Sequence, residues 1–437
     1  MPPDSPTPAP SGPGGNGVSR RRFLAGAAGV GVAGAGAVAL THRRWENVLS
    51  SSSSSRPTLT SGKGILVMVT LYGGNDGLNT VIPYQDSAYL QGRPNLGYQP
   101  NQVLPLTDGL GLHPNLKAMK ALWDAKELAI IRGVGYPNPV LSHFRGMDIW
   151  QTASPDEPLV TGVLGRWLDA TGSDPLRAIS IGSTLPRLLT GERSAGTAIV
   201  APTVTLPGGT AMAPALASLD APGPDRHGLS ALVAASGADL LNVQHTLADL
   251  MNAHRAATPA TATPRPGTGG GAAGARTVAT TLAGQLGVVA ELIAAGSPTR
   301  VYQVSMGGFD NHAQEKDTHA RLMTELDGAV SGFMTALGGS AAGSSVVLMT
   351  YSEFGRRVAE NLSGGTDHGT AAPLFVVGAP VKGGQFYGDE PSLANLDDGN
   401  LRFTTDFRRV FATMLAKVVG VDPKVALNGS FPTLNLL

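Results

Sequence analysis

The sequence predicts an α/β fold in which a mostly parallel sheet is covered by helices on both faces. Continuous apolar, β-branched runs are typical of strands buried on both sides, and here they alternate with segments whose apolar positions recur at helical spacing. Three of these runs also lead directly into Asp, Glu or His. Ligands collect at the carboxyl ends of strands in open α/β sheets, so a functional site is expected at that edge.

The predicted elements begin near Gly64 and continue towards the C-terminus. Strands are expected at 65–71, 128–131, 178–181, 300–305, 346–351 and 371–378. Helices are expected at 114–126, 142–150, 228–254, 277–295, 313–337 and 406–419. Ser142 is well placed as the N-cap of the second helix.

Length and composition narrow the class of protein. The 437 residues suffice for one large α/β domain or two ordinary ones, and 32 basic residues balance 32 acidic ones. This zero net charge gives no support for a nucleic-acid partner. The absence of cysteine excludes disulfides, thiolate metal sites and cysteine nucleophiles.

The N-terminus resembles a twin-arginine export signal. A stretch rich in Pro, Gly and Ser at 1–18 precedes Arg20, Arg21 and Arg22, and a Gly/Ala-rich apolar run of 16 residues follows at 25–40. A membrane anchor is the alternative, but this run is short and weakly apolar for a stable membrane span. We therefore expect export by the twin-arginine machinery to the periplasm, the cell wall or the medium.

Two regions are expected along the chain. Residues 1–56 comprise a disordered N-terminus, the signal peptide and a serine-rich tether. Residues 57–437 should form a single domain, because strands and helices resume directly after a low-complexity insert at about 256–276.

Acidic residues and histidines stand beside the ends of four predicted strands. They are Asp76, Asp310, His312, Glu353, Asp367 and His368. Carboxyl ends of neighbouring parallel strands meet at one edge of a sheet, which would bring such side chains together. A cluster of Asp, Glu and His suits a divalent metal such as Zn, Mn or Fe.

These residues also have structural interpretations. Asp76 could close a tight turn, and Asp310 could cap the helix that follows it. Glu353, which is costly to bury alone, could form an ion pair with Arg356 instead of binding a metal. His319 lies one heptad after the candidate ligand His312 and is expected to be exposed.

Ser142 is a candidate nucleophile. A serine hydroxyl at a helix N-terminus can attack if a metal lowers its pKa, although an ordinary N-cap is the alternative. His143 and His113 are further candidates without an assigned role.

Five motifs together resemble a known family. They are YGGNDGLN at 72–79, SHF at 142–144, GGFDNH at 307–312, SEFGR at 352–356 and GTDHG at 365–369. In this order, and with the twin-arginine leader, they resemble the exported bacterial family called domain of unknown function 1501, over about residues 64–437. That family is itself similar to the alkaline phosphatase and sulfatase superfamily, whose members bind two metals at the strand ends of an α/β sheet.

The resemblance implies an alkaline-phosphatase-like domain with roles for several residues. Asp76 matches, by its place, the metal ligand that follows the first strand of the superfamily. Asp310 and His312 match ligands that precede a long helix, and Ser142 matches the nucleophile.

One of the remaining motifs fits the superfamily and one departs from it. His368 lies in a Thr-Asp-His turn before a strand, which is similar to phosphopentomutase-like members. Glu353-Phe354 stands where the superfamily usually has an Asp-His pair. With this departure, one ligand of the metal that would activate the nucleophile is either missing or supplied by another residue.

The resemblance also implies one or two divalent metal ions, such as Zn or Mn. One ion would be bound by Asp310, His312 and His368. A second, weaker one would use Asp76 and Glu353.

The leading functional hypothesis is an exported metal-dependent hydrolase of phosphate or sulfate esters, either small or polymer-linked. Ser142 would attack the ester, and Arg145 or Arg356 would hold the ester oxygens. The competing hypothesis is a non-catalytic exported binding protein on a degenerate hydrolase scaffold, for which Phe354 is the best support.

Overall fold

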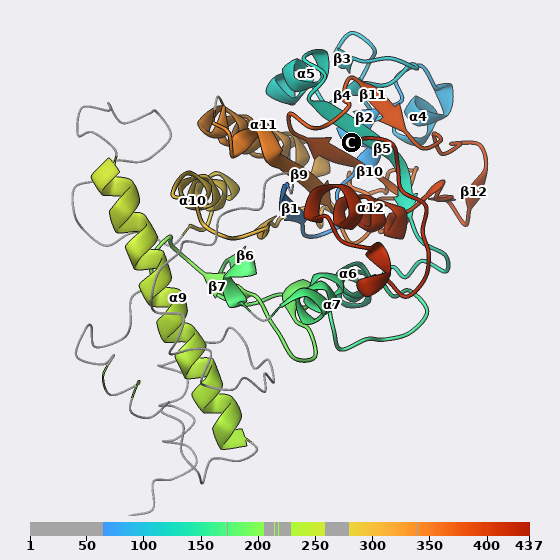
Figure 1. Cartoon of the computed structure of the whole chain (residues 1–437). Helices are drawn as coiled ribbons and strands as arrows, with labels where there is room; N and C mark the ends of the chain where they lie inside the picture. Colours follow the sequence, from blue (N-terminus) through green and yellow to red (C-terminus); the bar gives the residue numbers. More distant parts are fainter. Residues whose placement is uncertain are drawn as a thin grey trace, which may run out of the picture.

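A nine-stranded sheet organises the computed structural model, which describes residues 64–172, 174–204, 214, 217, 229–257, 279–338 and 340–437 (Figure 1). The strands lie in the order β11-β5-β10-β9-β1-β8-β6-β7, with β14 also paired to β5. They are β1 (Ile65–Leu71), β5 (Leu128–Gly135), β6 (Ala178–Ile181), β7 (Thr197–Ile199), β8 (Val301–Met306), β9 (Val346–Tyr351), β10 (Ala372–Val377), β11 (Gln385–Tyr387) and β14 (Thr405–Asp406).

The sheet is parallel except at one strand. The pairs of β1 with β8 and with β9, of β6 with β7 and with β8, and of β5 with β11 and with β14 are all parallel. Strand β10 runs antiparallel to both of its neighbours, β5 and β9. The prediction of a mostly parallel sheet is confirmed.

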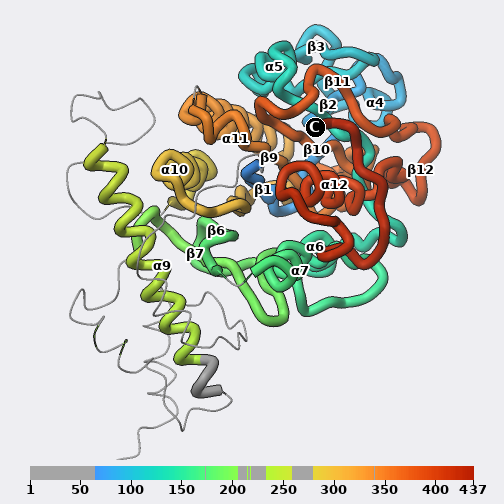
Figure 2. The backbone as a smooth tube through the Cα atoms, in the orientation of Figure 1, coloured from blue at the N-terminus to red at the C-terminus, as the bar shows by residue number. Residues whose placement is uncertain are grey.

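Strand β1 lies in the middle of the sheet, between β8 and β9, and Figure 2 shows it next to β9. All seven of its residues are buried, which explains why its sequence is apolar throughout instead of alternating. Val67 pairs with Tyr302 on one side and with Leu348 on the other. Alternate residues of β1 therefore belong to two separate cores, one on each face of the sheet.

Helices cover both faces, as predicted. The first core packs against α5 (Lys117–Asp124), α9 (Leu229–Ala257), α10 (Leu282–Ala294) and α11 (Glu315–Leu337). The second packs against α6 (His143–Thr152), α7 (Val163–Thr171), α12 (Phe407–Thr413) and the π-helical turn η5 (Met414–Val419). Figure 1 shows α10 and α11 on one side of the strands and α6, α7 and α12 on the other.

Small elements complete the described chain. The short helices are α3 (Gly77–Thr80), α4 (Ser87–Gly92), η1 (Pro175–Arg177), η2 (Arg187–Leu189), η4 (Gly343–Ser345) and η6 (Pro423–Val425). The short strands are β2 (Val81–Ile82), β3 (Leu104–Pro105), β4 (Gly111–Leu112), β12 (Leu396–Asp397) and β13 (Asn400–Leu401). Strands β2, β4 and β3 form a small sheet, and β12 pairs with β13.

Three predicted segments fall largely or wholly outside the described residues. The predicted leader and tether at 1–56 lie outside them, and so does the insert at about 256–276 except for the last residues of α9. Within the described part of the chain, no helix is both long enough and apolar enough to cross a membrane.

A glycine in α7 allows this helix to pack closely on the chain near η2. A Cβ atom added at Gly165 would lie 2.1 Å from the carbonyl oxygen of Thr190. At Gly287 in α10, no heavy atom of the described residues lies within 4 Å of the same added atom. The two helical glycines thus differ in the space around them.

We expect Gly165→Ala to destabilise the fold by about 1–3 kcal/mol, because backbone atoms cannot move aside as a flexible side chain would. Gly287→Ala is the matched control and should stabilise by roughly 0.5–1 kcal/mol through helix propensity. Urea denaturation of both variants measures this difference. Equal stabilities would contradict the packing described here.

Candidate metal centre

The directions of four strands bring the predicted site residues to one edge of the sheet. Strands β1, β8 and β9 end at this edge and lead into the segments that carry Asp76, Asp310 and Glu353. Since β10 is antiparallel to β9, its first residues lie at the same edge, and the turn before it carries His368. Arg356 and His368 form an isolated backbone bridge there.

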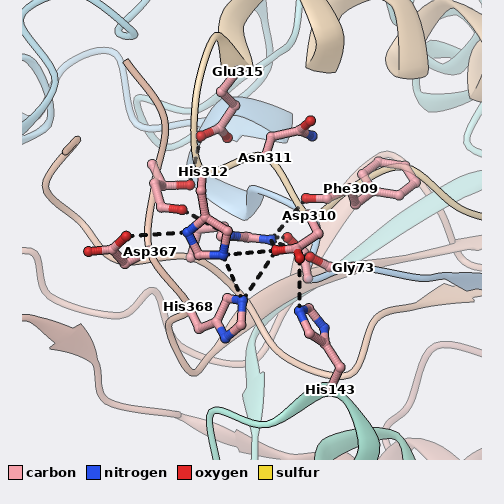
Figure 3. Close-up of polar contacts among 12 residues, drawn as sticks. Gly73, His143, Phe309, Asp310, Asn311, His312, Glu315, Asp367 and His368 are labelled. Carbon is pink, nitrogen blue, oxygen red and sulfur yellow. Dashed lines mark hydrogen bonds and ion pairs between the residues drawn. The ribbon is translucent and has the colours of Figure 1, made fainter. Parts of the chain in front are cut away.

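The Asp310 carboxylate is the centre of a cluster with three histidines (Figure 3). Asp310 Oδ1 lies 3.0 Å from His312 Nε2 and 3.2 Å from His368 Nε2. The two imidazole nitrogens are 3.0 Å apart. Asp310 Oδ2 lies 3.3 Å from His143 Nε2.

Each of the three imidazoles has its other nitrogen, Nδ1, on a separate acceptor. Nδ1 of His143 lies 2.8 Å from Glu353 Oε1, and Nδ1 of His312 lies 3.3 Å from Asp367 Oδ1. Nδ1 of His368 lies 2.8 Å from the Leu141 carbonyl oxygen. An Nδ1–H that donates to such an acceptor leaves the lone pair of a neutral imidazole on Nε2.

In this tautomer none of the three imidazoles donates into the cluster, while the Arg356 guanidinium donates to Asp310 Oδ1. Three Nε2 lone pairs and the Asp310 carboxylate then face one another, and the buried His143 Nε2 has no hydrogen-bond partner among the described residues. Such an arrangement is unfavourable unless a cation lies among the atoms. His143, Asp310 and His368 each offer a ligand atom, and these atoms lie within 4.8 Å of one another.

The spacing and chemistry fit a divalent metal. Ligands about 2.0–2.1 Å from a tetrahedral ion lie about 3.3 Å from each other, and the distances around Asp310 Oδ1 are 3.0 to 3.2 Å. Carboxylates that hold the distal nitrogen of a histidine are the usual outer shell of such ions, and Glu353 and Asp367 have this position. The residues present therefore fit a metal held by His143, Asp310 and His368, and His312 Nε2 lies beside them, 3.0 Å from Asp310 Oδ1.

Glu353 is fixed in the core of the site. Its side chain is 2 % exposed, and Oε1 accepts from the Gly73 backbone N–H at 2.8 Å. Gly73 has a φ of 118°, and an added Cβ would lie 2.4 Å from the Asp310 nitrogen. Glycine is therefore required where this strand end passes the Asp310 backbone. The predicted ligand Glu353 thus orients His143 and does not face the cluster itself.

The ring of Phe354 lies against two of the histidines. Its centroid is 4.9 Å from that of His143 and 4.7 Å from that of His368. Phe354 is buried, so an apolar ring and not a ligand side chain lies on this side of the two histidines.

Arg356 ties the loops of the site together. Its buried guanidinium donates to the carbonyl oxygens of Gly73, Gly74, Phe309 and Thr366 and, at 2.8 Å, to Asp310 Oδ1. Burial raises the pKa of Asp310, but the hydrogen bond and the charge of Arg356 outweigh it and lower this pKa to about 2. The proposed role of Arg356 in holding ester oxygens finds no support here, because the side chain is buried and each of its three nitrogens donates within the protein.

Asp76 lies apart from the cluster. Its carboxylate is buried and pairs with the equally buried Arg93. Burial raises the pKa of Asp76, but the Arg93 guanidinium outweighs it and holds the pKa below its usual range. The predicted metal ligand Asp76 is thus neutralised by an arginine, which was not anticipated from the sequence.

Glu315, at the start of α11, shares this buried pocket. Burial and the charge of Asp76 raise the pKa of the Glu315 carboxyl to about 8. Asp76 Oδ1 is buried without a hydrogen-bond donor among the described residues, and a protonated Glu315 can donate to it. Glu315 Oε2 also accepts from Thr366 Oγ1 at 2.7 Å, which connects the pocket to the turn that carries His368.

His319 and His113 are buried, not solvated. The expectation that His319 is exposed is wrong, because it faces the core, 3.1 Å from Asn75 Oδ1. Burial lowers the pKa of His319 to about 4 and that of His113 to about 3. His113 is 2.8 Å from the Tyr98 hydroxyl. Both are structural residues of the pocket around Asp76.

Ser142 and Arg145 flank the cluster on α6. Ser142 is exposed, is the N-cap of α6 and makes no side-chain capping bond. Its neighbours Leu141 and His143 both touch the cluster, through the Leu141 carbonyl and the His143 ring. Arg145 pairs with Asp148 at 2.5 Å, so its guanidinium is engaged away from Asp310.

His143 is the residue of the site to which sequence reasoning gave no role. It does not follow a strand, unlike the other candidates, since it opens a helix after a loop. The motif SHF at 142–144 marked the segment, but nothing local indicates that its imidazole reaches a carboxylate more than 160 residues away.

We expect the protein to bind one zinc ion, and His368→Ala to weaken that binding at least about 100-fold by removing a direct ligand. Glu353→Gln should weaken it about 10–100-fold, because it removes the charge that orients His143. The exposed His245 on α9 gives the control, His245→Ala. Titration calorimetry with zinc measures all four proteins, and equal affinities would refute the assignment.

We also expect folding stability to fall as pH rises from 6.5 to 8 because of Glu315. Its pKa is raised in the folded state, so the unfolded state releases this proton first, and one group contributes at most about 1.4 kcal/mol per pH unit. Glu315→Gln should remove this contribution, whereas Glu325→Gln on the same helix should keep it. Urea denaturation across this pH range, with chelator present, measures how the free energy of unfolding of each protein changes with pH. His113 and His319 also contribute to the pH dependence of stability, and the comparison of each variant with wild type cancels their contribution. Identical slopes for wild type and Glu315→Gln would contradict the protonated carboxyl.

Several solved structures are similar to this chain at low sequence identity. A protein in the alkaline phosphatase superfamily from Vibrio parahaemolyticus is 12% identical, with 86% of this chain and 72% of that chain covered and a TM-score of 0.38. Ps i-CgsB is 10% identical, with coverages of 84% and 75% and a TM-score of 0.38. The lipoteichoic acid synthase LtaP from Listeria monocytogenes is 8% identical, with coverages of 87% and 79% and a TM-score of 0.34.

Comparison of the sequence with protein-family models gives a match over part of the chain. No curated protein matches the chain. Residues 233–429 match the family model described as "Protein of unknown function (DUF1501)", and this range contains Asp310, His312, Glu353 and His368. The match bears out the resemblance predicted from the motifs over residues 233–429, which hold three of the five motifs.

Proposed function

We propose that the chain is an exported metal-dependent hydrolase of phosphate or sulfate esters. The observation that carries the proposal is the cluster of three imidazoles around the Asp310 carboxylate, in which His143 Nε2 has no hydrogen-bond partner among the described residues, beside an exposed serine. His143, Asp310, His312 and His368 would hold the ion. A set rich in imidazole favours zinc over magnesium or calcium.

A single metal fits this chain better than two. Among the residues that the structure describes, one group of His and Asp side chains has ligand spacing. Asp76, which a second ion would need, is paired with Arg93. When bound, a divalent ion supplies positive charge that stabilises ester oxygens and lowers the pKa of a nearby hydroxyl.

Ser142 is the proposed nucleophile. Its hydroxyl is exposed, is not used as a helix cap and lies between two residues that touch the cluster. Its Oγ would bond to the phosphorus or sulfur atom while the bond to the leaving oxygen breaks. The serine proton passes to solvent, the leaving oxygen takes a proton from water, and a second water releases the acid group from Ser142.

Other residues prepare the site for this reaction. Glu353 and Asp367 orient two imidazoles, and Arg356 fixes Asp310. The Phe354 ring covers one side of His143 and His368 and excludes water from it. These contacts hold the ligands in place before substrate binds. Electrostatic stabilisation of a transition state is most effective when the charged and polar groups are already positioned in this way.

Export remains part of the proposal. The arginines at 20–22 and the apolar run after them are the features that support it, and they lie outside the described residues. The twin-arginine machinery is the proposed export partner, and the substrate would be met outside the cytoplasm.

A second candidate function is a non-catalytic exported binding protein. Two observations favour it: Phe354 replaces a ligand side chain, and Arg93 neutralises Asp76. In this case the metal centre would bind an anionic group without turning it over. The two functions differ in what Ser142 does.

We expect the zinc- or manganese-loaded protein to hydrolyse an aryl phosphate or an aryl sulfate, and Ser142→Ala to lower kcat by roughly 10³-fold or more. Zinc affinity should not change, since Ser142 is not a ligand. Ser344→Ala, at another exposed serine, is the control. Turnover that survives in Ser142→Ala would exclude the serine nucleophile. Metal binding without turnover of any ester in the wild type would favour the binding protein.

A further inference from the structure

Several exposed apolar residues adjoin, along the chain, residues of the metal centre. Among the described residues, the exposed large hydrophobic side chains are Leu141, Phe144, Val160, Val233, Leu362, Phe403 and Val425. Single exposed residues of this kind are ordinary on protein surfaces. Three of these seven, however, adjoin residues that hold the histidines of the centre.

The connection of these three residues to the centre is direct. The Leu141 carbonyl oxygen lies 2.8 Å from His368 Nδ1. Leu362 follows Asn361, whose side-chain amide donates to the His312 carbonyl at 3.0 Å and to Asp367 Oδ1 at 3.2 Å.

Phe144 follows the ligand residue His143 in the first turn of α6. We call Leu141, Phe144 and Leu362 the apolar rim. The rim thus has members on two segments that approach the centre from different parts of the chain.

The fold gives the rim no packing role. Phe144 is 92% exposed and Leu362 is 108% exposed, so neither contributes to a core. Arg145, next to Phe144, is paired with Asp148 and supplies no free charge to the rim. A polar centre for an anionic group is thus bordered by side chains that favour contact with an apolar group.

We propose that the substrate is an ester of a large apolar alcohol or phenol, whose acid group lies at the metal and whose apolar group lies on Leu141, Phe144 and Leu362. This inference rests on the function proposed above and specifies its substrate class. It differs from a site for small or heavily hydroxylated esters, because sugar hydroxyls would gain nothing from this rim. The apolar group would cover side chains that water now surrounds.

The test uses binding, so it does not require turnover. The zinc-loaded full chain is titrated with n-alkylphosphonates from methyl to octyl, which resemble the esters and cannot be hydrolysed, at concentrations below micelle formation. Partial burial of each added methylene should tighten binding about twofold, hence roughly 100-fold from methyl to octyl. Calorimetry provides each Kd.

Two variants locate the contact. Phe144→Ser and Leu362→Ser should each lower the octyl-to-methyl affinity ratio by at least about fivefold, because an apolar contact is removed. Both positions are exposed, so the fold should persist, and a thermal melt checks this. Val233→Ser, at an exposed position on α9, should keep the wild-type ratio.

The outcomes separate the two proposals. Methylphosphonate that fails to bind the zinc-loaded protein would refute the metal-dependent function and this inference with it. Methylphosphonate that binds while affinity stays constant with chain length would overturn the inference alone. An affinity that rises with chain length in wild type, with an octyl-to-methyl ratio that is unchanged in both rim variants, would place the apolar group elsewhere. That result would also overturn the inference.

Discussion

The contacts of the Arg356 guanidinium are the interaction on which the site depends. This buried side chain joins the segments after β1 and β8 and the turn before β10, and it also holds Asp310. Five acceptors around one fork-shaped cation satisfy the carbonyl oxygens that strand ends leave unpaired. Without it, Asp310 would lose its fixed position, and the three histidines would have no common point to face.

The two aspartates that follow strands β1 and β8 show how environment decides the role of a residue. Asp76 is buried and pairs with Arg93, so its negative charge is neutralised within the core. Asp310 is 48% exposed, and its two oxygens face imidazole nitrogens. The same residue type at equivalent places thus serves structure in one case and offers ligand atoms in the other.

Much of the fold and part of the centre could be predicted from the sequence. Strand β1 is predictable because burial on both faces leaves only apolar residues, and Asp310, His312 and His368 because they adjoin strand ends. The reversed direction of β10 and the pairing of Asp76 with Arg93 are not, because both depend on partners distant in sequence. His143 was missed for the same reason.

The way the centre is assembled has a consequence for the order of events in folding. Its parts come from α6, from the loop after β8 and from the turn before β10, and the contact of Leu141 with His368 joins residues 227 positions apart. Closing such long loops costs chain entropy that only a nearly complete sheet offsets. No single segment carries all the proposed ligands, so an ion held by all of them would be captured only after the domain has folded. A pathway that carries folded proteins would suit such a chain, because the metal could be loaded before the membrane is crossed.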